Sequence, residues 1–250
     1  MSTLALRPAH APVRSRLVRH AASSLVLLAA LSVSAARAAT LVSWNAPLQT
    51  AAPGVFTTPA PTVADGVAST AMAMVNQGTL SPVGPSTTAW RFGNWSNNPT
   101  AYLGFSITAD ADTRLVIDNF FITASLETTS GASWTNATLA LSYSPTANFS
   151  SGVTSAGSLA LGSIGASSTT SFTSSVAGTY FSTPLTIEGG ETYYFKLNPT
   201  GYSGFNARLW LRADGTSDIT VSGTASAIPE PSAAAALAGL LGLGCVLTRR

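Results

Sequence analysis

The feature that most constrains the fold of this chain is an alternation of apolar and polar residues with a period of two. Leu103, Phe105 and Ile107 occupy every second position, and polar or small residues stand between them. Successive side chains of a β-strand point to opposite faces, so this pattern predicts half-buried strands rather than helices. The same spacing recurs in four further segments, at residues 139–143, 193–197, 209–211 and 219–221.

The most apolar stretch, residues 115–126, predicts a central strand. Asp118-Asn119 interrupts it, as either a bulge or a turn would, and we favour a bulge. Asp214-Gly215 is a hairpin-turn signal and predicts that residues 209–211 pair with residues 219–221. Residues 64–75 leave room for one or two helical turns. We therefore predict an all-β domain over residues 39–227, a β-sandwich of jelly-roll type.

The composition of this domain excludes several classes of function. It holds neither histidine nor cysteine, because His10, His20 and Cys245 all lie outside it. Thiolate or imidazole zinc sites, Ser-His-Asp triads, cysteine nucleophiles and disulfides are thereby removed, and an enzyme is not expected. Five basic against nine acidic side chains give residues 39–228 a net charge of −4. A nucleic-acid partner, which requires clustered cations, is not expected either.

The N-terminus carries a secretory signal pattern. Four arginines and no acidic residue occur in the first twenty residues, and an apolar stretch follows over residues 21–33. A stretch of about 13 residues is too short for a transmembrane anchor. Ala36-Arg37-Ala38 fits the small-residue rule for cleavage, so residues 1–38 are predicted to be removed between Ala38 and Ala39. The Sec translocon and signal peptidase are the implied partners.

The C-terminus combines a motif, an apolar run and a basic end. Pro229-Glu230-Pro231 precedes sixteen uncharged residues, 233–248, and Arg249 and Arg250 follow them. A helix of this length spans roughly 24 Å, less than the ~30 Å hydrocarbon core, so the predicted transmembrane helix inserts only marginally. The terminal arginines favour the cytoplasmic side and leave the preceding domain outside the inner membrane.

This tripartite tail, residues 228–250, resembles the PEP-CTERM sorting signal of exported proteins in Gram-negative bacteria. The resemblance implies processing near Pro229-Glu230-Pro231 by an exosortase. It further implies transient residence in the inner membrane, then release or attachment at the surface of a cell that produces exopolysaccharide. It covers about twenty residues and implies nothing specific about the domain.

A long neutral region lies within the predicted domain. Residues 128–187 are sixty consecutive positions without Asp, Glu, Lys or Arg. A flexible linker is one interpretation, but strands with polar outer faces fit better, because large apolar residues recur inside it. These residues are Leu159, Leu161, Ile164, Phe172, Val176, Tyr180 and Phe181. A hydroxyl-rich, uncharged surface would suit a hydrated polysaccharide matrix.

Four residues are candidates for carbohydrate binding: Trp90, Asn94, Trp95 and Trp210. The first three lie in the densest aromatic cluster of the chain, and sugar sites combine stacking rings with amide hydrogen bonds. The alternative is that Trp90 and Trp95 fill the core. Trp210 alternates with two leucines and is expected to face outward, where stacking on the flanking arginines would also explain it.

Two pairs of acidic residues suggest further chemistry. Asp110 and Asp112 near a strand end are candidate calcium ligands, with a solvated turn as the alternative. Glu188 and Glu191 flank Gly189-Gly190, and glycoside hydrolysis needs two carboxylates about 5 to 10 Å apart. A tight exposed turn would produce the same sequence. Apart from calcium, no cofactor is expected.

These observations favour a non-enzymatic surface or extracellular-matrix protein associated with exopolysaccharide or biofilm. A lectin-like carbohydrate-binding module is the main alternative. A glycoside hydrolase that uses only Asp and Glu is a remote one.

Overall fold

The computed structural model describes residues 38–44, 58, 60–76, 89–93, 100–204, 206–212 and 219–228, with backbone alone at 89–93 and 212. The regular secondary structure in these ranges consists of β-strands alone, so the all-β prediction is confirmed. The predicted signal peptide up to residue 37, the Pro229-Glu230-Pro231 motif and the predicted helix 233–248 lie outside the described residues. Within the described ranges, no helix has the length and apolar character needed to cross a membrane.

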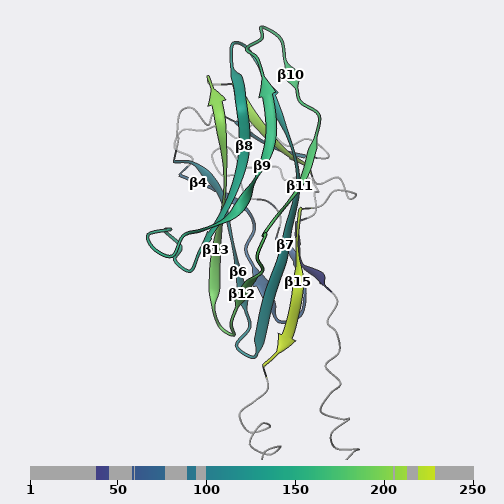
Figure 1. The fold of residues 1–250 in the computed structure, drawn as a ribbon, viewed down its shortest axis with the longest axis vertical. Coiled ribbons are helices and arrows are strands. Elements are labelled where there is room, and N and C mark those ends of the chain that lie inside the picture. The colour runs from purple at the N-terminus through teal and green to yellow at the C-terminus, as the bar shows by residue number, and fades with distance from the viewer. Residues whose placement is uncertain are drawn as a thin grey trace, which may run out of the picture. The chain divides into compact units, whose positions relative to one another are not determined.

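The larger of two antiparallel sheets is organised around one long strand, β7 (Thr113–Thr128). Along one edge of β7 lie three short strands, β10 (Ser171–Phe172), β11 (Val176–Tyr180) and β12 (Leu185–Ile187). Along its other edge lie β14 (Ala207–Arg212) and β15 (Ile219–Ala227), and β15 runs beside β7 in Figure 1. Outer positions are taken by β1 (Ala39–Trp44), β2 (Thr62–Val63) and β5 (Ala89–Gly93).

The register confirms a bulge in β7 at the predicted place. Ser222 of β15 pairs with Asn119, whereas Gly223 pairs with Ile117, so Asp118 is an extra residue on β7. One inserted residue exchanges the two faces of a strand. Core residues therefore stand at odd positions before the bulge, Leu115 and Ile117, and at even positions after it, beginning with Phe120.

The predicted hairpin at Asp214-Gly215 is wrong in its strand pairing. β14 pairs with residues 123–128 of β7 and β15 pairs with residues 113–121, both antiparallel and both along the same edge. The two segments thus follow one another along β7 and do not pair with each other. Residues 213–218, which include Asp214 and Gly215, lie outside the described residues. The turn signal reports only local sequence preference, whereas both flanking strands pair with the sixteen-residue strand β7.

The smaller sheet has β13 (Thr192–Ser203) between β6 (Tyr102–Ala109) and β8 (Ser133–Ser144). β9 (Thr154–Ile164) pairs with the far side of β8, and Figure 1 shows β8 and β9 side by side. β3 (Val67–Ser69) and β4 (Ala73–Val75) pair with β6, so the region that left room for helical turns forms short strands. The neutral region from 128 to 187 also forms strands, as predicted.

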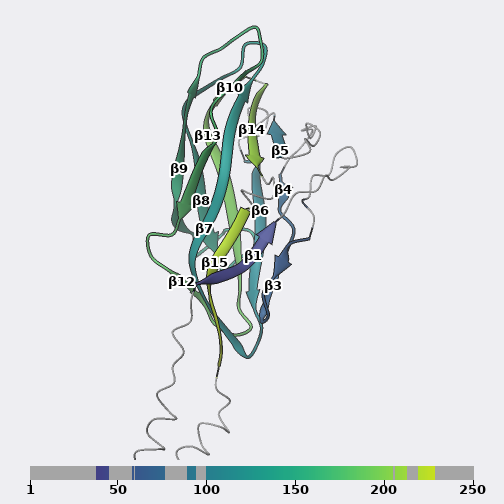
Figure 2. The same cartoon turned by 90° about the vertical axis from the view of Figure 1, so that its right-hand side faces the viewer.

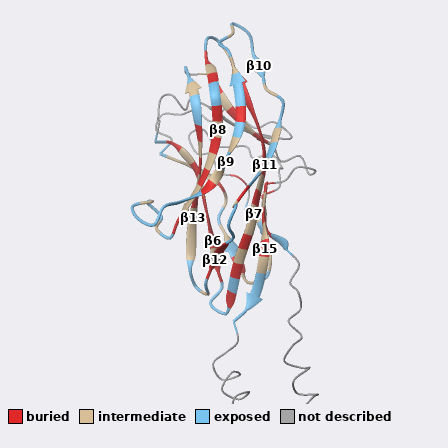
Figure 3. Ribbon diagram, viewed as in Figure 1, coloured by how far each residue is buried: buried red, intermediate tan, exposed pale blue. Residues whose placement is uncertain are grey.

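The two sheets bury one face each against the other. Phe105 of the smaller sheet stacks on Phe195 at 4.8 Å between ring centroids and contacts Phe120 of the larger sheet at 5.6 Å. Trp44 of β1 meets Phe105 edge-on at 4.8 Å. Buried and half-exposed positions alternate along the first part of β7, up to Ile122, and along the middle of β8, which matches the predicted period of two (Figure 3).

Polar side chains also join the sheets. The Tyr180 hydroxyl donates to the Leu139 carbonyl at 2.9 Å, and the Trp134 indole donates to the Glu127 carbonyl at 3.1 Å. Burial raises the pKa of Tyr180 well above its ordinary value, so this phenol remains a neutral donor at physiological pH. Each bond satisfies a buried donor that would otherwise destabilise the packed interface.

The first and last strands of the domain are neighbours. Ala39 at the start of β1 pairs with Gly223 in the middle of β15, and Trp44 pairs with Ile219 at its beginning. Figure 2 shows β1 beside β15. The Ile228 amide extends this end of the sheet by donating to the Asp112 carbonyl at 2.7 Å. Because the two strands are antiparallel, the chain enters β1 from the end of the ladder toward which it leaves β15.

The bulge in β7 requires glycine at position 223. A Cβ there would lie 1.9 Å from the Val116 carbonyl oxygen, and backbone cannot move aside as a flexible side chain can. We predict that Gly223→Ala lowers the free energy of unfolding by at least about 2 kcal/mol, measured by urea denaturation. Gly165→Ala is the control, because a Cβ at this exposed position meets nothing within 4 Å. Equal effects of the two substitutions would contradict the proposed register.

Candidate functional site: an aromatic pocket at Lys196

An open pocket of 570 Å³ lies on the outer side of the smaller sheet, where β4, β6, β13 and the loop between β8 and β9 meet. In Figure 1 this loop projects beside β13. The residues that give the pocket its chemical character are Tyr102, Asn148, Phe149 and Lys196. None of them was selected by the sequence analysis as a site residue.

Strand register places Tyr102 and Lys196 side by side. Lys196 of β13 pairs with Gly104 of β6, and Tyr102 is two residues before Gly104 on the same face. A Cβ at position 104 would stand 3.1 Å from the Tyr102 ring and 3.2 Å from a Val75 methyl group. The absence of a side chain at Gly104 therefore leaves room for the ring to approach Lys196.

The loop of residues 145–153 supplies the second ring and is built around Ser144. This fully buried hydroxyl donates to the Ser151 carbonyl at 2.7 Å and accepts from the Thr146 amide at 3.0 Å. The Phe149 amide then donates to the Thr146 carbonyl at 3.0 Å. These bonds fold the loop into a defined conformation.

Phe149 itself has a left-handed backbone, with φ of 53°. For a bulky residue this conformation costs on the order of 1–2 kcal/mol, so the surrounding loop must hold it there. It brings the Phe149 ring edge-on to Tyr102, with centroids 5.7 Å apart and an interplanar angle of 76°. Two aromatic rings from distant parts of the chain thus line one half-buried surface.

Lys196 is the only lysine in the sequence, and its ammonium group is held by the two rings. Nζ lies 4.8 Å from the Tyr102 centroid and 5.9 Å from the Phe149 centroid, which are cation–π distances. No acidic side chain among the described residues forms an ion pair with it. Burial raises the pKa of Tyr102, so its phenol remains protonated beside the ammonium group.

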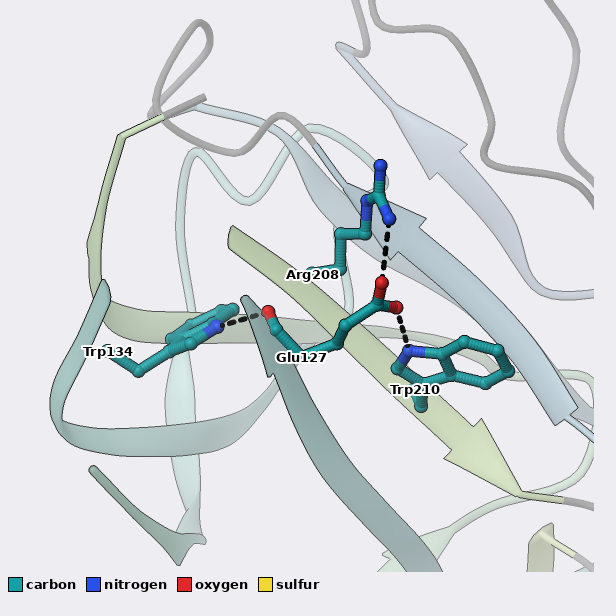
Figure 4. A network of polar contacts seen from close by, with 4 residues as sticks. All are labelled: Glu127, Trp134, Arg208 and Trp210. Atoms are coloured by element: carbon teal, nitrogen blue, oxygen red, sulfur yellow. Dashed lines mark hydrogen bonds and ion pairs between the residues drawn. The ribbon is translucent and has the colours of Figure 1, made fainter. Parts of the chain in front are cut away.

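A second polar cluster lies on the outer face of the larger sheet and is drawn in Figure 4. Glu127 is 2% exposed, and its carboxylate accepts from Arg208 Nη1 at 2.7 Å and from the Trp210 indole at 2.5 Å. Arg208 is the direct cross-strand neighbour of Glu127. Both carboxylate oxygens of Glu127 are thus engaged by donors of the same sheet, and we interpret the cluster as one that stabilises the fold.

The residues proposed for carbohydrate binding do not form one described site. Trp210 is half-buried, donates to Glu127 and contacts the exposed Phe172 edge-on at 6.2 Å. Trp90 pairs with Leu211 in the backbone register, but its side chain is outside the description. Asn94 and Trp95 lie outside the described residues.

The two aspartates proposed as calcium ligands stand in the exposed connection between β6 and β7. The Thr113 amide closes this turn by donating to the Asp110 carbonyl at 2.9 Å. The Thr113 hydroxyl lies 3.4 Å from Asp112 Oδ1. The described residues contain no group of three or more acidic, histidine or cysteine side chains that could hold a metal ion. Among the described residues, no third acidic, histidine or cysteine side chain therefore joins Asp110 and Asp112 to form a metal site.

The two glutamates proposed for hydrolysis are engaged within one tight turn between β12 and β13. The Glu188 amide donates to Glu191 Oε2 at 3.1 Å, and the Glu191 amide donates to the Glu188 carbonyl at 3.0 Å. Glu188 also pairs with Arg114 at 3.1 Å. This arrangement stabilises the turn and does not place two carboxylates across a pocket.

Sequence signals for the residues that were missed did exist, but they were weak. Lys196 is the single lysine, and it alternates between Phe195 and Leu197 on a strand whose opposite face is apolar. Glu127 is the single acidic residue at the end of the most apolar stretch. Tyr102 and Phe149 carry no local signal, because only the fold brings them together.

Sequence comparison does not assign this chain to a family. A scan against protein-family models finds no match, and a search of curated proteins finds none with significant sequence similarity. The function of this chain is therefore inferred from the arrangement of its own residues.

The Glu127 cluster allows a direct comparison of a buried and an exposed ion pair. We predict that Glu127→Ala lowers the free energy of unfolding by about 3–5 kcal/mol, because Arg208 and the Trp210 indole lose their buried acceptor. Glu188→Ala removes a pair whose side chains are 51% and 54% exposed, and should cost less than about 1 kcal/mol. Urea denaturation of both variants measures the difference. Similar losses would show that the Glu127 pair is not the stabilising one.

Proposed function

We propose that this chain is an exported, non-enzymatic cell-surface or extracellular-matrix protein. Its two packed sheets are proposed to form a β-sandwich of jelly-roll type between a cleaved signal peptide and a C-terminal sorting signal. The Sec translocon, signal peptidase and an exosortase would act on it in turn. It would be anchored transiently in the inner membrane and then displayed in a matrix of exopolysaccharide or biofilm.

The single observation that best supports this proposal is the pairing of the first and last strands. Ala39, the predicted new N-terminus, is the first residue of β1 and pairs with Gly223 of β15. Cleavage between Ala38 and Ala39 would therefore leave the strand intact. Because β1 and β15 are antiparallel neighbours, the chain enters β1 from the end of their ladder toward which it leaves β15, so the segments predicted to meet the membrane are attached toward that same end. That arrangement is compatible with one membrane holding both before processing.

The outer face of the smaller sheet supports a role in a hydrated matrix. Threonine hydroxyls pair across its strands, at 2.8 Å between Thr138 and Thr200 and at 2.8 Å between Thr108 and Thr192. Residues 128–187, which supply β8 and β9 of this sheet, contribute no charged side chain. Such a surface exchanges hydrogen bonds with sugars and water without attracting counterions.

A second candidate function is carbohydrate binding by the pocket at Lys196. Tyr102 and Phe149 offer ring surfaces, and Asn148 offers an amide at the rim, which are the groups that sugar sites combine. The volume of 570 Å³ falls within the range of about 300–1,000 Å³ that is usual for ligand sites. This pocket is a second candidate surface beside the cluster around Trp90 and Trp95, whose side chains lie outside the described residues.

Export is tested with a reporter enzyme fused after residue 228, active only outside the cytoplasm. We predict activity from the fusion that contains residues 1–228 and none from a fusion that lacks residues 1–38. Mass spectrometry of the released protein should give Ala39 as the first residue and a C-terminus near Pro229-Glu230-Pro231. A cytoplasmic location of the reporter in the fusion that contains residues 1–228 would overturn the proposal.

Carbohydrate binding is tested by affinity electrophoresis in the producing cell's own exopolysaccharide. We predict that Phe149→Ala weakens binding about fivefold, since an aromatic contact contributes about 1 kcal/mol. Phe172→Ala is the control, because this ring is 60% exposed and contacts Trp210. Both residues lie on the larger sheet, away from the pocket. Loss of retardation by Phe172→Ala alone would move the site to Trp210. No retardation of the unmodified protein would discard this candidate.

A further inference from the structure

We propose that the pocket at Lys196 selects an acidic sugar residue, whose carboxylate pairs with the Lys196 ammonium group while its ring lies against Tyr102 and Phe149. This inference rests on the proposed carbohydrate-binding function and adds the chemical class of the ligand. It distinguishes a carboxylated polysaccharide from the neutral polymer that the surrounding hydroxyl-rich surface would equally accept.

The ammonium group of Lys196 is held in place without an acidic partner. Its position over two rings, at 4.8 and 5.9 Å from their centroids, restricts the side chain but leaves its positive charge uncompensated. Arg114 and Arg208, by contrast, each form an ion pair with a glutamate. Lys196 is therefore the described cation most available to an anionic ligand.

Distant acids of the same domain do not cancel this charge. Glu191 lies five residues back along the path of β13, which corresponds to about 17 Å at the rise of an extended strand. Asp110 lies six residues beyond Gly104, the register partner of Lys196, or about 20 Å along β6. Exposed charges are largely screened beyond about 8 Å at physiological ionic strength. The local charge of the pocket is thus positive although the domain as a whole is acidic.

The rim of the pocket provides a donor suited to a sugar hydroxyl. The Asn148 side-chain oxygen accepts from the Ser150 amide at 3.1 Å, which orients the group. Within the described part of the chain, its amide nitrogen has no acceptor. The amide is therefore aligned by the loop and able to donate to a ligand.

The loop conformation indicates a preformed site. Ser144 and Thr146 fix residues 145–153 by hydrogen bonds, and these hold Phe149 at its strained φ of 53°. A hydrophobic ring kept half-exposed at a conformational cost, beside a cation, favours a role in contact with a ligand over a role in packing. Preorganisation of this kind reduces the ordering that binding would otherwise require.

The test compares two polymers that differ only in their carboxyl groups. The exported protein, as its cells release it, is titrated with polygalacturonate and with the same polymer after chemical reduction of its carboxyl groups. We expect tighter binding to polygalacturonate, weakened roughly tenfold by Lys196→Gln and restored by Lys196→Arg. Arg114→Gln is the matched control, because it removes one exposed positive charge away from the pocket. Thermal unfolding of each variant confirms that it is folded.

The outcomes separate this inference from the function on which it rests. Equal binding of both polymers, with Lys196→Gln unaffected and Phe149→Ala weakened, would overturn the acidic ligand and keep carbohydrate binding. Equal weakening by Lys196→Gln and Arg114→Gln would reveal non-specific attraction and overturn the site. Absence of binding to either polymer and to the cell's own exopolysaccharide would overturn both proposals.

A chemical modification provides an independent measurement. Because Lys196 is the only lysine, acetylation neutralises one side chain in the whole protein, together with the N-terminal amine. Reductive methylation modifies the same groups but preserves their charge. Acetylation should weaken polygalacturonate binding and methylation should not. Equal effects of both reagents would contradict a carboxylate pairing with Lys196.

Discussion

The rest of the structure depends on the pairing of β7 along both of its edges. Residues 171–187 follow one edge in three short strands, and residues 207–227 follow the other in two. A sixteen-residue strand in this position has its backbone groups satisfied from five other segments. From Ile122 to Thr128 it is buried on both faces, so a polar residue there must find partners within the protein. Glu127 finds them in Arg208 and Trp210.

The smaller sheet has a different character, and the proposed site follows from it. Its inner face is apolar, whereas its outer side carries paired threonines, the rings of Tyr102 and Phe149, and one lysine. Nothing in the packing of the core requires Tyr102, Phe149 and Lys196 to meet. They meet because β13 pairs with β6 and because the loop after β8 folds back over that pair. The residues of this surface are therefore not constrained by core packing and could bind a ligand, while the larger sheet stabilises the fold.

The sequence predicted which residues face the core better than which strands are neighbours. Leu103, Phe105 and Ile107 are buried as expected, and the bulge at Asp118 explains why the strict alternation fails between Ile117 and Phe120. The Asp214-Gly215 signal failed because a turn propensity is worth little against the many backbone and side-chain contacts that β7 offers to both flanking strands. Trp210 was correctly expected on the face opposite Leu209 and Leu211, but its partner Glu127 was not foreseen.

The sequence by itself determined the class of fold, the inward and outward faces of the strands and the absence of histidine and cysteine chemistry from the domain. These properties depend on local order along the chain, since alternation and composition are the same in any arrangement of strands. Only the tertiary structure decided that Tyr102, Phe149 and Lys196 form one pocket and that Glu188 and Glu191 are engaged within a turn. Strand pairing and the loop after β8 bring Tyr102 into contact with Phe149 and Lys196, which lie 47 and 94 positions further along the chain. The energies that select such pairings are spread over many contacts, so no short motif records them.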